Sequence, residues 1–151
     1  MPKEISCTEA YDKCAAEGNI IFLLESDIER VKSMLEIAEE QWKAAKTLLD
    51  KKLWNSTYKM HYDVLHLLAE AFLLLDKVKI KNHLCLFAYL CQKYPKLGLD
   101  WNFFERIRTK RNGVAYYGSP VNEKDWKEVA LQFEMDIKLL KRKTEEKCQT
   151  K

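Results

Sequence analysis

Residues that interrupt helices are scarce in this chain. Its 151 residues include 4 glycines and 3 prolines. An all-β sandwich or barrel needs a turn about every 8–12 residues, and so few turn-forming residues disfavour that class of fold. Hydrophobic residues make up 47% of the chain and charged residues 32%, which is typical of a folded protein and not of a disordered one. The sequence therefore predicts a few long helices joined by short loops.

The two clearest helices lie in the first half of the chain. Residues 26–52 begin with a capping box at Ser26, and their apolar residues recur at three- and four-residue steps. A second helix is predicted to start at Asn55 or Ser56 and to end near Val78. Its apolar stripe is wider, as a central core helix requires.

Three more helices are predicted from residues that can cap an amino-terminal turn, namely Asn82, Asp100 and Asn122. The first of them stops at Pro95, and Gly118 ends the second. Short connections between such helices place neighbours antiparallel. The predicted fold is all-α, an up-and-down antiparallel bundle of four to five helices.

The amino-terminal part of the chain is less regular. A short helix is predicted over 8–17, and the apolar run 20–25 fits either a buried strand or the approach to the next helix. The length corresponds to about one domain. Residues 1–151 are therefore predicted to form a single helical domain, with a core at 26–147 and an amino-terminal helix or extension at 1–25.

The cysteines and the apolar runs bear on the cellular compartment. Five cysteines form an odd set without a CxxC pair, so the sequence supports neither a disulfide framework nor a zinc site. We expect reduced cysteines, with Cys85 and Cys91 packed as small apolar side chains. The chain has no uninterrupted run of 18 apolar residues, and its amino terminus is too polar for a signal peptide. The expectation is a soluble, cytoplasmic protein without membrane association, metal or cofactor.

Positive charge is concentrated towards the carboxyl terminus. The net charge is +3, composed of −1 over residues 1–100 and +4 over residues 101–151. Four basic residues fall within six positions, which are Arg106, Arg108, Lys110 and Arg111, and Tyr116 and Tyr117 follow them. Arg108 and Arg111 are one helical turn apart and could share a phosphate, and the tyrosines could stack on bases. The alternative is a solvated helix face followed by two interface or core tyrosines.

Gly113 lies inside this helical pattern, where glycine costs roughly 1 kcal/mol relative to alanine. Close approach of another backbone or of a ligand would justify that cost, as would a local irregularity of the helix. Arg111 and Tyr116 are about 140° apart on an ideal helix. Their convergence requires long side chains, a distorted turn or a second subunit.

Acidic residues and histidines of the core helix are further candidates. Asp63 and Glu70 are seven residues apart on nearly the same face, so at least one could be a buried partner of an arginine. The three histidines, which are His61, His66 and His83, lack metal-ligand spacing and are predicted to be structural. No glycine-rich phosphate loop and no GxSxG motif occurs.

The pattern resembles the HEPN family (higher eukaryotes and prokaryotes nucleotide-binding domains). The matching features are a tyrosine-containing second helix (YKMHYDVLHLLAEAFLL), a short helix opening with NH, and a late helix carrying RNxxxYYG. The resemblance covers roughly residues 26–145. It implies a homodimer in which two arginine motifs face one cleft, and a minimal nucleotidyltransferase partner in a toxin–antitoxin-like module.

Family members that are metal-independent ribonucleases carry arginine, a polar residue and then histidine. The resemblance places Arg111 and Asn112 at the first two positions, but Tyr116 stands where the histidine is expected, and no histidine follows Arg111. An ordinary tyrosine, with a pKa of about 10, is only on the order of 0.1% ionised at pH 7. The sequence therefore favours a non-catalytic or weakly catalytic module.

Three functions follow from these patterns. The first is an RNA- or nucleotide-binding module; its binding residues are Arg108, Arg111, Asn112, Tyr116 and Tyr117, and its supporting residues are Asp63, Glu70 and His83. The second is a metal-independent endoribonuclease, with Arg111 and Tyr116 as the catalytic pair or with His61 or His83 as the proton-transfer group. The third is a dimeric interaction module without a ligand, which the surplus of 4 Trp, 7 Tyr and 6 Phe favours.

Overall fold

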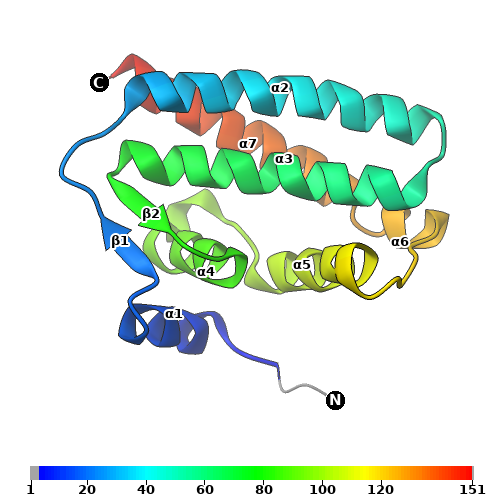
Figure 1. Ribbon diagram of the computed structural model, residues 1–151, viewed down its shortest axis with the longest axis horizontal. Helices are drawn as coiled ribbons and strands as arrows, with labels where there is room; N and C mark the ends of the chain where they lie inside the picture. The colour runs from blue at the N-terminus through cyan, green and yellow to red at the C-terminus, as the bar shows by residue number, and fades with distance from the viewer. Residues whose placement is uncertain (1–3, 151) are drawn as a thin grey trace.

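A computed structural model describes residues 4–150, and helices dominate these residues (Figure 1). In chain order the elements are α1 (Cys7–Ala16), β1 (Ile20–Phe22), α2 (Ile28–Asp50), α3 (Trp54–Leu75), β2 (Val78–Ile80), α4 (His83–Lys93), the 3₁₀ turn η1 (Pro95–Leu97), α5 (Trp101–Tyr116), α6 (Glu123–Lys127) and α7 (Ala130–Gln149). The predicted all-α bundle of four to five helices is confirmed in part: the described residues are mostly helical and pack as a bundle, but they form seven α-helices and a small two-stranded sheet. No helix of this described part is long and apolar enough to span a membrane.

α3 is the central helix of the bundle. It packs against α2, α4, α5 and α7, and 13 of its 22 residues are buried, so it is covered on nearly every side. The predicted central core helix is confirmed. Figure 1 shows that α2 runs antiparallel to α3, whereas α7 runs in the same direction as α3. Phe87 of α4 stacks on Phe104 of α5, with ring centroids 4.3 Å apart, and so fixes α5 beside α4.

The three predicted caps in the second half of the chain are confirmed. The side chains of Asn82, Asp100 and Asn122 each accept a backbone N–H bond from the first turn of α4, α5 and α6 respectively. The last predicted helix is divided, because α6 ends at Lys127 and α7 begins at Ala130. The three- and four-residue apolar spacing continues across this break, so the sequence pattern gives no sign of it.

Two predicted caps in the first half are wrong. Asp27, and not Ser26, caps α2, because the Ser26 hydroxyl donates instead to the Leu75 carbonyl at 3.1 Å. α3 begins at Trp54 without a side-chain cap. The side chain of Asn55 is engaged elsewhere and accepts a bond of 2.7 Å from the backbone N–H of Val121.

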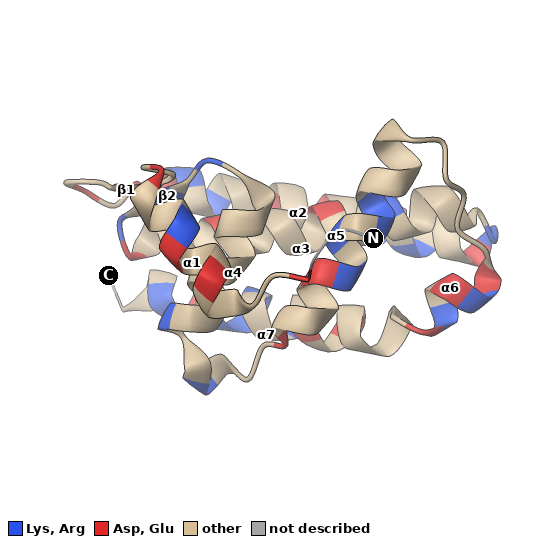
Figure 2. Ribbon diagram, turned by 90° about the horizontal axis from the view of Figure 1, so that it is seen from below, with Lys and Arg blue, Asp and Glu red and all other residues tan. Residues whose placement is uncertain are grey.

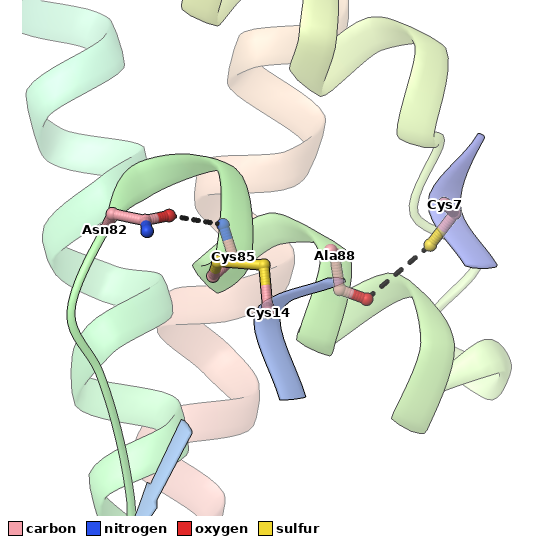
Figure 3. Close-up of a disulfide and its surroundings, with 5 residues drawn as sticks. All are labelled: Cys7, Cys14, Asn82, Cys85 and Ala88. Atoms are coloured by element: carbon pink, nitrogen blue, oxygen red, sulfur yellow. Dashed lines mark hydrogen bonds between the residues drawn. A yellow bond between two sulfur atoms is a disulfide. The ribbon is translucent and has the colours of Figure 1, made fainter. Parts of the chain in front are cut away.

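The amino-terminal segment is tied to the bundle at two places. β1 pairs antiparallel with β2, with Ile20 opposite Ile80, so the run 20–25 begins as a strand. α1 packs against α4, and a disulfide joins Cys14 to Cys85 (Figure 3). The expectation that all cysteines are reduced is therefore wrong for this pair. The two residues are 71 positions apart, and only the packing of α1 on α4 brings their Cα atoms to 5.7 Å, within bridging range.

Candidate functional site

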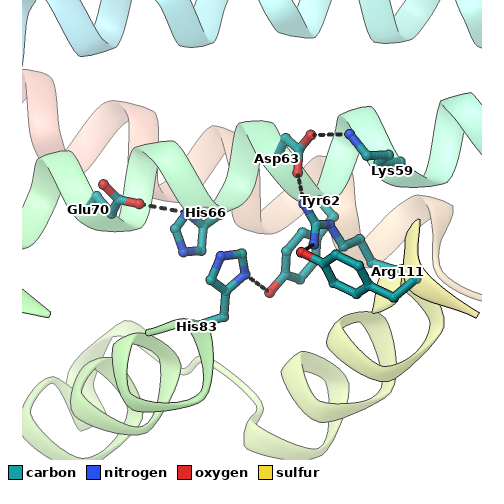
Figure 4. A network of polar contacts seen from close by, with 8 residues as sticks. Lys59, Tyr62, Asp63, His66, Glu70, His83 and Arg111 are labelled. Atoms are coloured by element: carbon teal, nitrogen blue, oxygen red, sulfur yellow. Dashed lines mark hydrogen bonds and ion pairs between the residues drawn. The ribbon is translucent and has the colours of Figure 1, made fainter. Parts of the chain in front are cut away.

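Arg111 projects from α5 towards α3 and lies beside Tyr62 and Asp63 (Figure 4). Its Nη2 is 3.5 Å from Asp63 Oδ1, and the Arg111 side chain is only 12% exposed. Lys59 lies on the other side of the carboxylate, 3.4 Å from Oδ2. The prediction that Asp63 or Glu70 pairs with an arginine is confirmed for Asp63. Glu70 contacts His66 instead.

Tyr116 closes over the same guanidinium. Arg111 Nη1 donates to the Tyr116 hydroxyl at 3.2 Å. The guanidinium carbon lies 5.5 Å from the Tyr62 ring centroid and 5.6 Å from that of Tyr116, so it sits between two aromatic rings. Arg111 and Tyr116 both lie within the continuous helix α5, so the length of their side chains accounts for their convergence. Long side chains were one of the three explanations that the helical spacing left open.

The guanidinium of Arg111 is incompletely bonded. It carries five N–H donors. Its Nε is buried and has no hydrogen-bond partner among the described residues, and the contact with Asp63 is at the long limit of a hydrogen bond. An arginine with donors left over in a half-buried position favours an additional acceptor, and phosphate matches its geometry best.

The other three basic residues of the motif already have carboxylate partners. Arg108 makes two hydrogen bonds to Glu105, at 2.8 and 3.1 Å. The two remaining pairs are Arg106 with Glu128, at 3.3 Å, and Lys110 with Asp125, at 3.6 Å. Figure 2 shows basic and acidic segments interspersed along the helices. The local positive field is thus weaker than the run of basic residues suggests.

Two histidines from different helices meet next to Tyr62. The ring centroids of His66, on α3, and His83, on α4, are 3.8 Å apart. The Tyr62 hydroxyl is hydrogen bonded to His83 Nδ1 at 2.9 Å, and His66 Nδ1 lies 2.8 Å from Glu70 Oε1 (Figure 4). Burial, assisted by His66 and Arg111, lowers the pKa of His83 to about 4, so this ring is neutral at pH 7. The linear spacing gave no signal for this pair.

The third histidine is structural, as predicted. His61 is buried, and its Nδ1 is 2.7 Å from the Thr57 carbonyl. Its ring centroid is 4.5 Å from that of Trp126, on α6. Burial lowers the pKa of His61, which disfavours a charged ring in this position.

The carboxyl end of α5 presents two exposed aromatic residues. Tyr116 is 68% exposed and Tyr117 is 79% exposed, and their rings meet edge to face. A Cβ added to Gly113 would lie 3.3 Å from the Cβ of Ser119, because the chain turns back onto the helix at this point. The close approach of the Ser119 side chain, and not of another backbone, therefore limits the room at Gly113. Asn112 is half-buried on the same turn of α5.

Two searches for further clues, one for metal-binding clusters in residues 4–150 and one for similar known proteins, found no match. Residues 4–150 contain no group of three or more His, Cys, Asp or Glu side chains that could hold a metal ion. A scan against protein-family models finds no match to the chain, and no curated protein matches it in sequence.

Proposed function

We propose that this chain is a HEPN-like helical module that binds RNA or a nucleotide at the surface around Arg111. The observation that carries the proposal is the state of the guanidinium, which lies between two aromatic rings and has one long ion pair and a buried Nε without a partner in residues 4–150. A phosphate group would supply acceptor oxygens for the terminal N–H groups of Arg111 that neither Asp63 nor Tyr116 uses. Asp63 holds the guanidinium in place in the absence of ligand.

The exposed tyrosines supply the second half of a nucleotide site. Base–aromatic stacking contributes about 1–3 kcal/mol per base and tolerates any base, so Tyr116 and Tyr117 suit a single-stranded ligand. Arg108 and Asn112 flank Arg111 on α5 and belong to the proposed contact surface. Glu70 and His83 support the site from α3 and α4, through His66 and Tyr62 respectively.

The ion pairs of α5 limit the electrostatic contribution to the proposed binding. Because Arg106 and Lys110 face carboxylates, we expect only one or two phosphate contacts. For single-stranded nucleic acid the slope of log K against log salt is then about −0.7 to −1.4. A much steeper slope would indicate a different and more basic surface.

Binding of a short fluorescent single-stranded RNA, measured by anisotropy at low salt, tests the proposal. Arg111→Ala should weaken binding at least about tenfold, which corresponds to about 1.4 kcal/mol. The matched control is Arg142→Ala, because Arg142 is an arginine of α7 that faces Glu146. The proposal is wrong if the wild-type protein does not bind, or if both variants bind equally well. Far-ultraviolet circular dichroism establishes that each variant is folded.

The second candidate function is metal-independent cleavage of RNA, and the position of His83 and Arg111, which both contact Tyr62, favours it. A neutral His83 could accept the proton of an attacking 2′-hydroxyl while Arg111 stabilises the charge on the phosphate. Its low pKa makes it a weaker base than an ordinary imidazole, so binding ranks before catalysis. Cleavage in the presence of EDTA that is lost in both Arg111→Ala and His83→Ala would reverse that ranking.

The proposal includes a homodimer, a minimal nucleotidyltransferase as a possible protein partner, and a cytoplasmic location. Exposed Tyr116 and Tyr117 suit a protein interface as well as a nucleotide. Light scattering over a range of concentrations tests self-association, and a monomer throughout would contradict the dimer.

The state of Cys14 and Cys85 in cells tests the location, because persistent disulfides are rare in the reducing cytosol. In protein isolated from cells under thiol-blocking conditions, an intact Cys14–Cys85 bond would contradict a cytoplasmic location.

A further inference from the structure

Two helices of this protein carry two cysteines each and pack against one another. α1 contains Cys7 and Cys14, and α4 contains Cys85 and Cys91. At a rise of 1.5 Å per residue, the members of each pair are about 10 Å and about 9 Å apart along their helix axes. One residue of each pair, Cys14 and Cys85, is already joined in a disulfide.

The contacts between the two helices show that they run antiparallel. Cys14, near the end of α1, meets Cys85, near the start of α4. Thr8, near the start of α1, lies 3.5 Å from Gln92, near the end of α4. This direction brings the remaining cysteine of α1 to the remaining cysteine of α4.

The second pair of cysteines lies at the other end of the same helix contact. The Cys7 thiol donates to the carbonyl of Ala88, one turn before Cys91, at 3.5 Å (Figure 3), and the neighbouring Thr8 contacts Gln92. Cys7 and Cys91 are both free thiols and half-buried. The start of α1 is held in place independently, because Trp101 Nε1 donates to the Ile5 carbonyl at 3.0 Å. The two cysteines are therefore neighbours across the contact between α1 and α4, which the existing disulfide and this bond hold at both ends.

We propose that Cys7 and Cys91 are the site of a second, reversible disulfide, which clamps α1 to α4 at the end opposite Cys14–Cys85. The inference concerns the amino-terminal segment and does not depend on the function proposed for the Arg111 surface. It gives that segment a role, because the nested pair of bonds would fix α1 on the helix whose first residue is His83.

The reaction requires a disulfide oxidant, such as glutathione disulfide. One cysteine thiolate attacks a sulfur of the oxidant, a mixed disulfide forms, and one glutathione thiolate leaves. The second cysteine thiolate attacks the protein sulfur of the mixed disulfide, and the second glutathione leaves. Two cysteine thiols are thereby oxidised, and one glutathione disulfide is reduced to two glutathione thiols. Burial raises the pKa of both cysteines, so closure should accelerate as the pH increases.

Counting free thiols in the full chain tests the proposal. The protein is incubated with glutathione disulfide at pH 8, alkylated under denaturing conditions and weighed by mass spectrometry. Before oxidation we expect three alkylated cysteines, which are the three free thiols Cys7, Cys91 and Cys148. After oxidation we expect one, at Cys148, together with a proteolytic peptide in which Cys7 is bonded to Cys91.

Variants make the assignment specific. Cys148→Ser should leave no alkylated cysteine after oxidation, whereas Cys91→Ser should leave Cys7 either alkylated or bonded to glutathione. The proposal is overturned if the oxidised wild-type protein keeps three alkylated cysteines, if it carries glutathione instead of a protein disulfide, or if Cys148 is the residue that pairs. Peptide mapping of the wild-type protein gives this answer even if a variant fails to fold.

Discussion

Two carboxylates of the central helix region, Asp63 and Asp76, each face a cation from a later helix, yet the two clusters are bonded very differently. Lys147 Nζ lies 2.6 Å from Asp76 Oδ2 and 3.6 Å from the centroid of the Phe72 ring. Arg111 Nη2 lies 3.5 Å from Asp63 Oδ1. The same kinds of group therefore form a tight contact at one end of α3 and a loose one towards its other end.

The tyrosines of the two clusters, Tyr94 and Tyr116, also differ in their hydrogen bonds. In the Asp76 cluster, which consists of Phe72, Asp76, Tyr94 and Lys147, the hydroxyl of Tyr94 donates to the carboxylate. In the Arg111 cluster, which consists of Tyr62, Asp63, His83, Arg111 and Tyr116, the hydroxyl of the exposed Tyr116 accepts from the guanidinium. The first arrangement binds α7 to the end of α3. The second leaves guanidinium N–H groups of Arg111 without a partner among the described residues and the Tyr116 ring exposed, which suits the ligand site proposed above.

A third carboxylate sharpens the comparison because it faces no cation within the described part of the chain. Asp136 on α7 is buried, with one oxygen bonded to Gln132 and the other without a hydrogen-bond partner among the described residues. Burial raises the pKa of Asp136 to about 6. We expect Asp136→Asn to increase the free energy of unfolding at pH 7 by about 2–3 kcal/mol, because the amide removes a buried charge. Urea denaturation measures this difference.

The sign of the pH dependence follows from the same pKa. Between pH 4 and 6 the folded state holds a proton on Asp136 that the unfolded chain releases, so the wild-type protein loses stability as pH rises through this range. The gain from Asp136→Asn should disappear near pH 4. Glu134→Gln, at an exposed carboxylate of the same helix, serves as the control: Lys138 lowers the pKa of this group, so its removal should not increase stability at pH 7. A constant gain at every pH would contradict the explanation.

Removing the two cations tests the contrast between the clusters directly. Lys147→Ala should lower the free energy of unfolding by about 1–2 kcal/mol, because it removes a short ion pair and the cover over Phe72. Arg111→Ala should cost less than about 1 kcal/mol, since its bonds are long and one donor is unpaired. For RNA binding we expect the larger loss in Arg111→Ala and the smaller loss in Lys147→Ala. Equal losses of stability in the two variants would remove the distinction.

The sequence was sufficient for the helices and for some of the site, and the residues show why. Caps such as Asn82 act within one turn, so their signal is local and was read correctly. Asn55 failed as a cap because its partner, Val121, is 66 residues away. The pairing of Asp63 with an arginine was predictable, since a half-buried carboxylate needs a cation. The Cys14–Cys85 bond and the meeting of His66 with His83 depend on how α4 packs, which no linear spacing encodes.

The pH dependence of stability distinguishes the Arg111 cluster from the Asp76 cluster, because only the Arg111 cluster contains a histidine, His83. The pKa of His83 is lowered to about 4 in the folded state, so between pH 4 and 6.5 the unfolded chain binds the additional proton. This residue therefore stabilises the fold increasingly as pH rises through that window, and its contribution is lost in acid. His83 is half-exposed, so we expect an effect of about 1 kcal/mol. In the Asp136→Asn background, His83→Gln should reduce the remaining increase of stability with pH, and urea denaturation at several pH values measures it.

The smallest effect is expected where the loop after α5 meets Gly113. Gly113→Ala gains helix propensity of up to about 1 kcal/mol, but its Cβ would press on Ser119, whose backbone N–H donates to the Gly113 carbonyl at 2.9 Å. The loop is exposed and can move by a few tenths of an ångström, so the net change in the free energy of unfolding should stay within about 0.5 kcal/mol. Gly113→Leu cannot be accommodated in this way and should displace the turn that follows Tyr116 and Tyr117. If the tyrosines contribute to the site, Gly113→Leu should lower the free energy of RNA binding by more than it lowers the free energy of unfolding. Equal RNA binding by Gly113→Ala and Gly113→Leu would place the ligand on Arg111 alone.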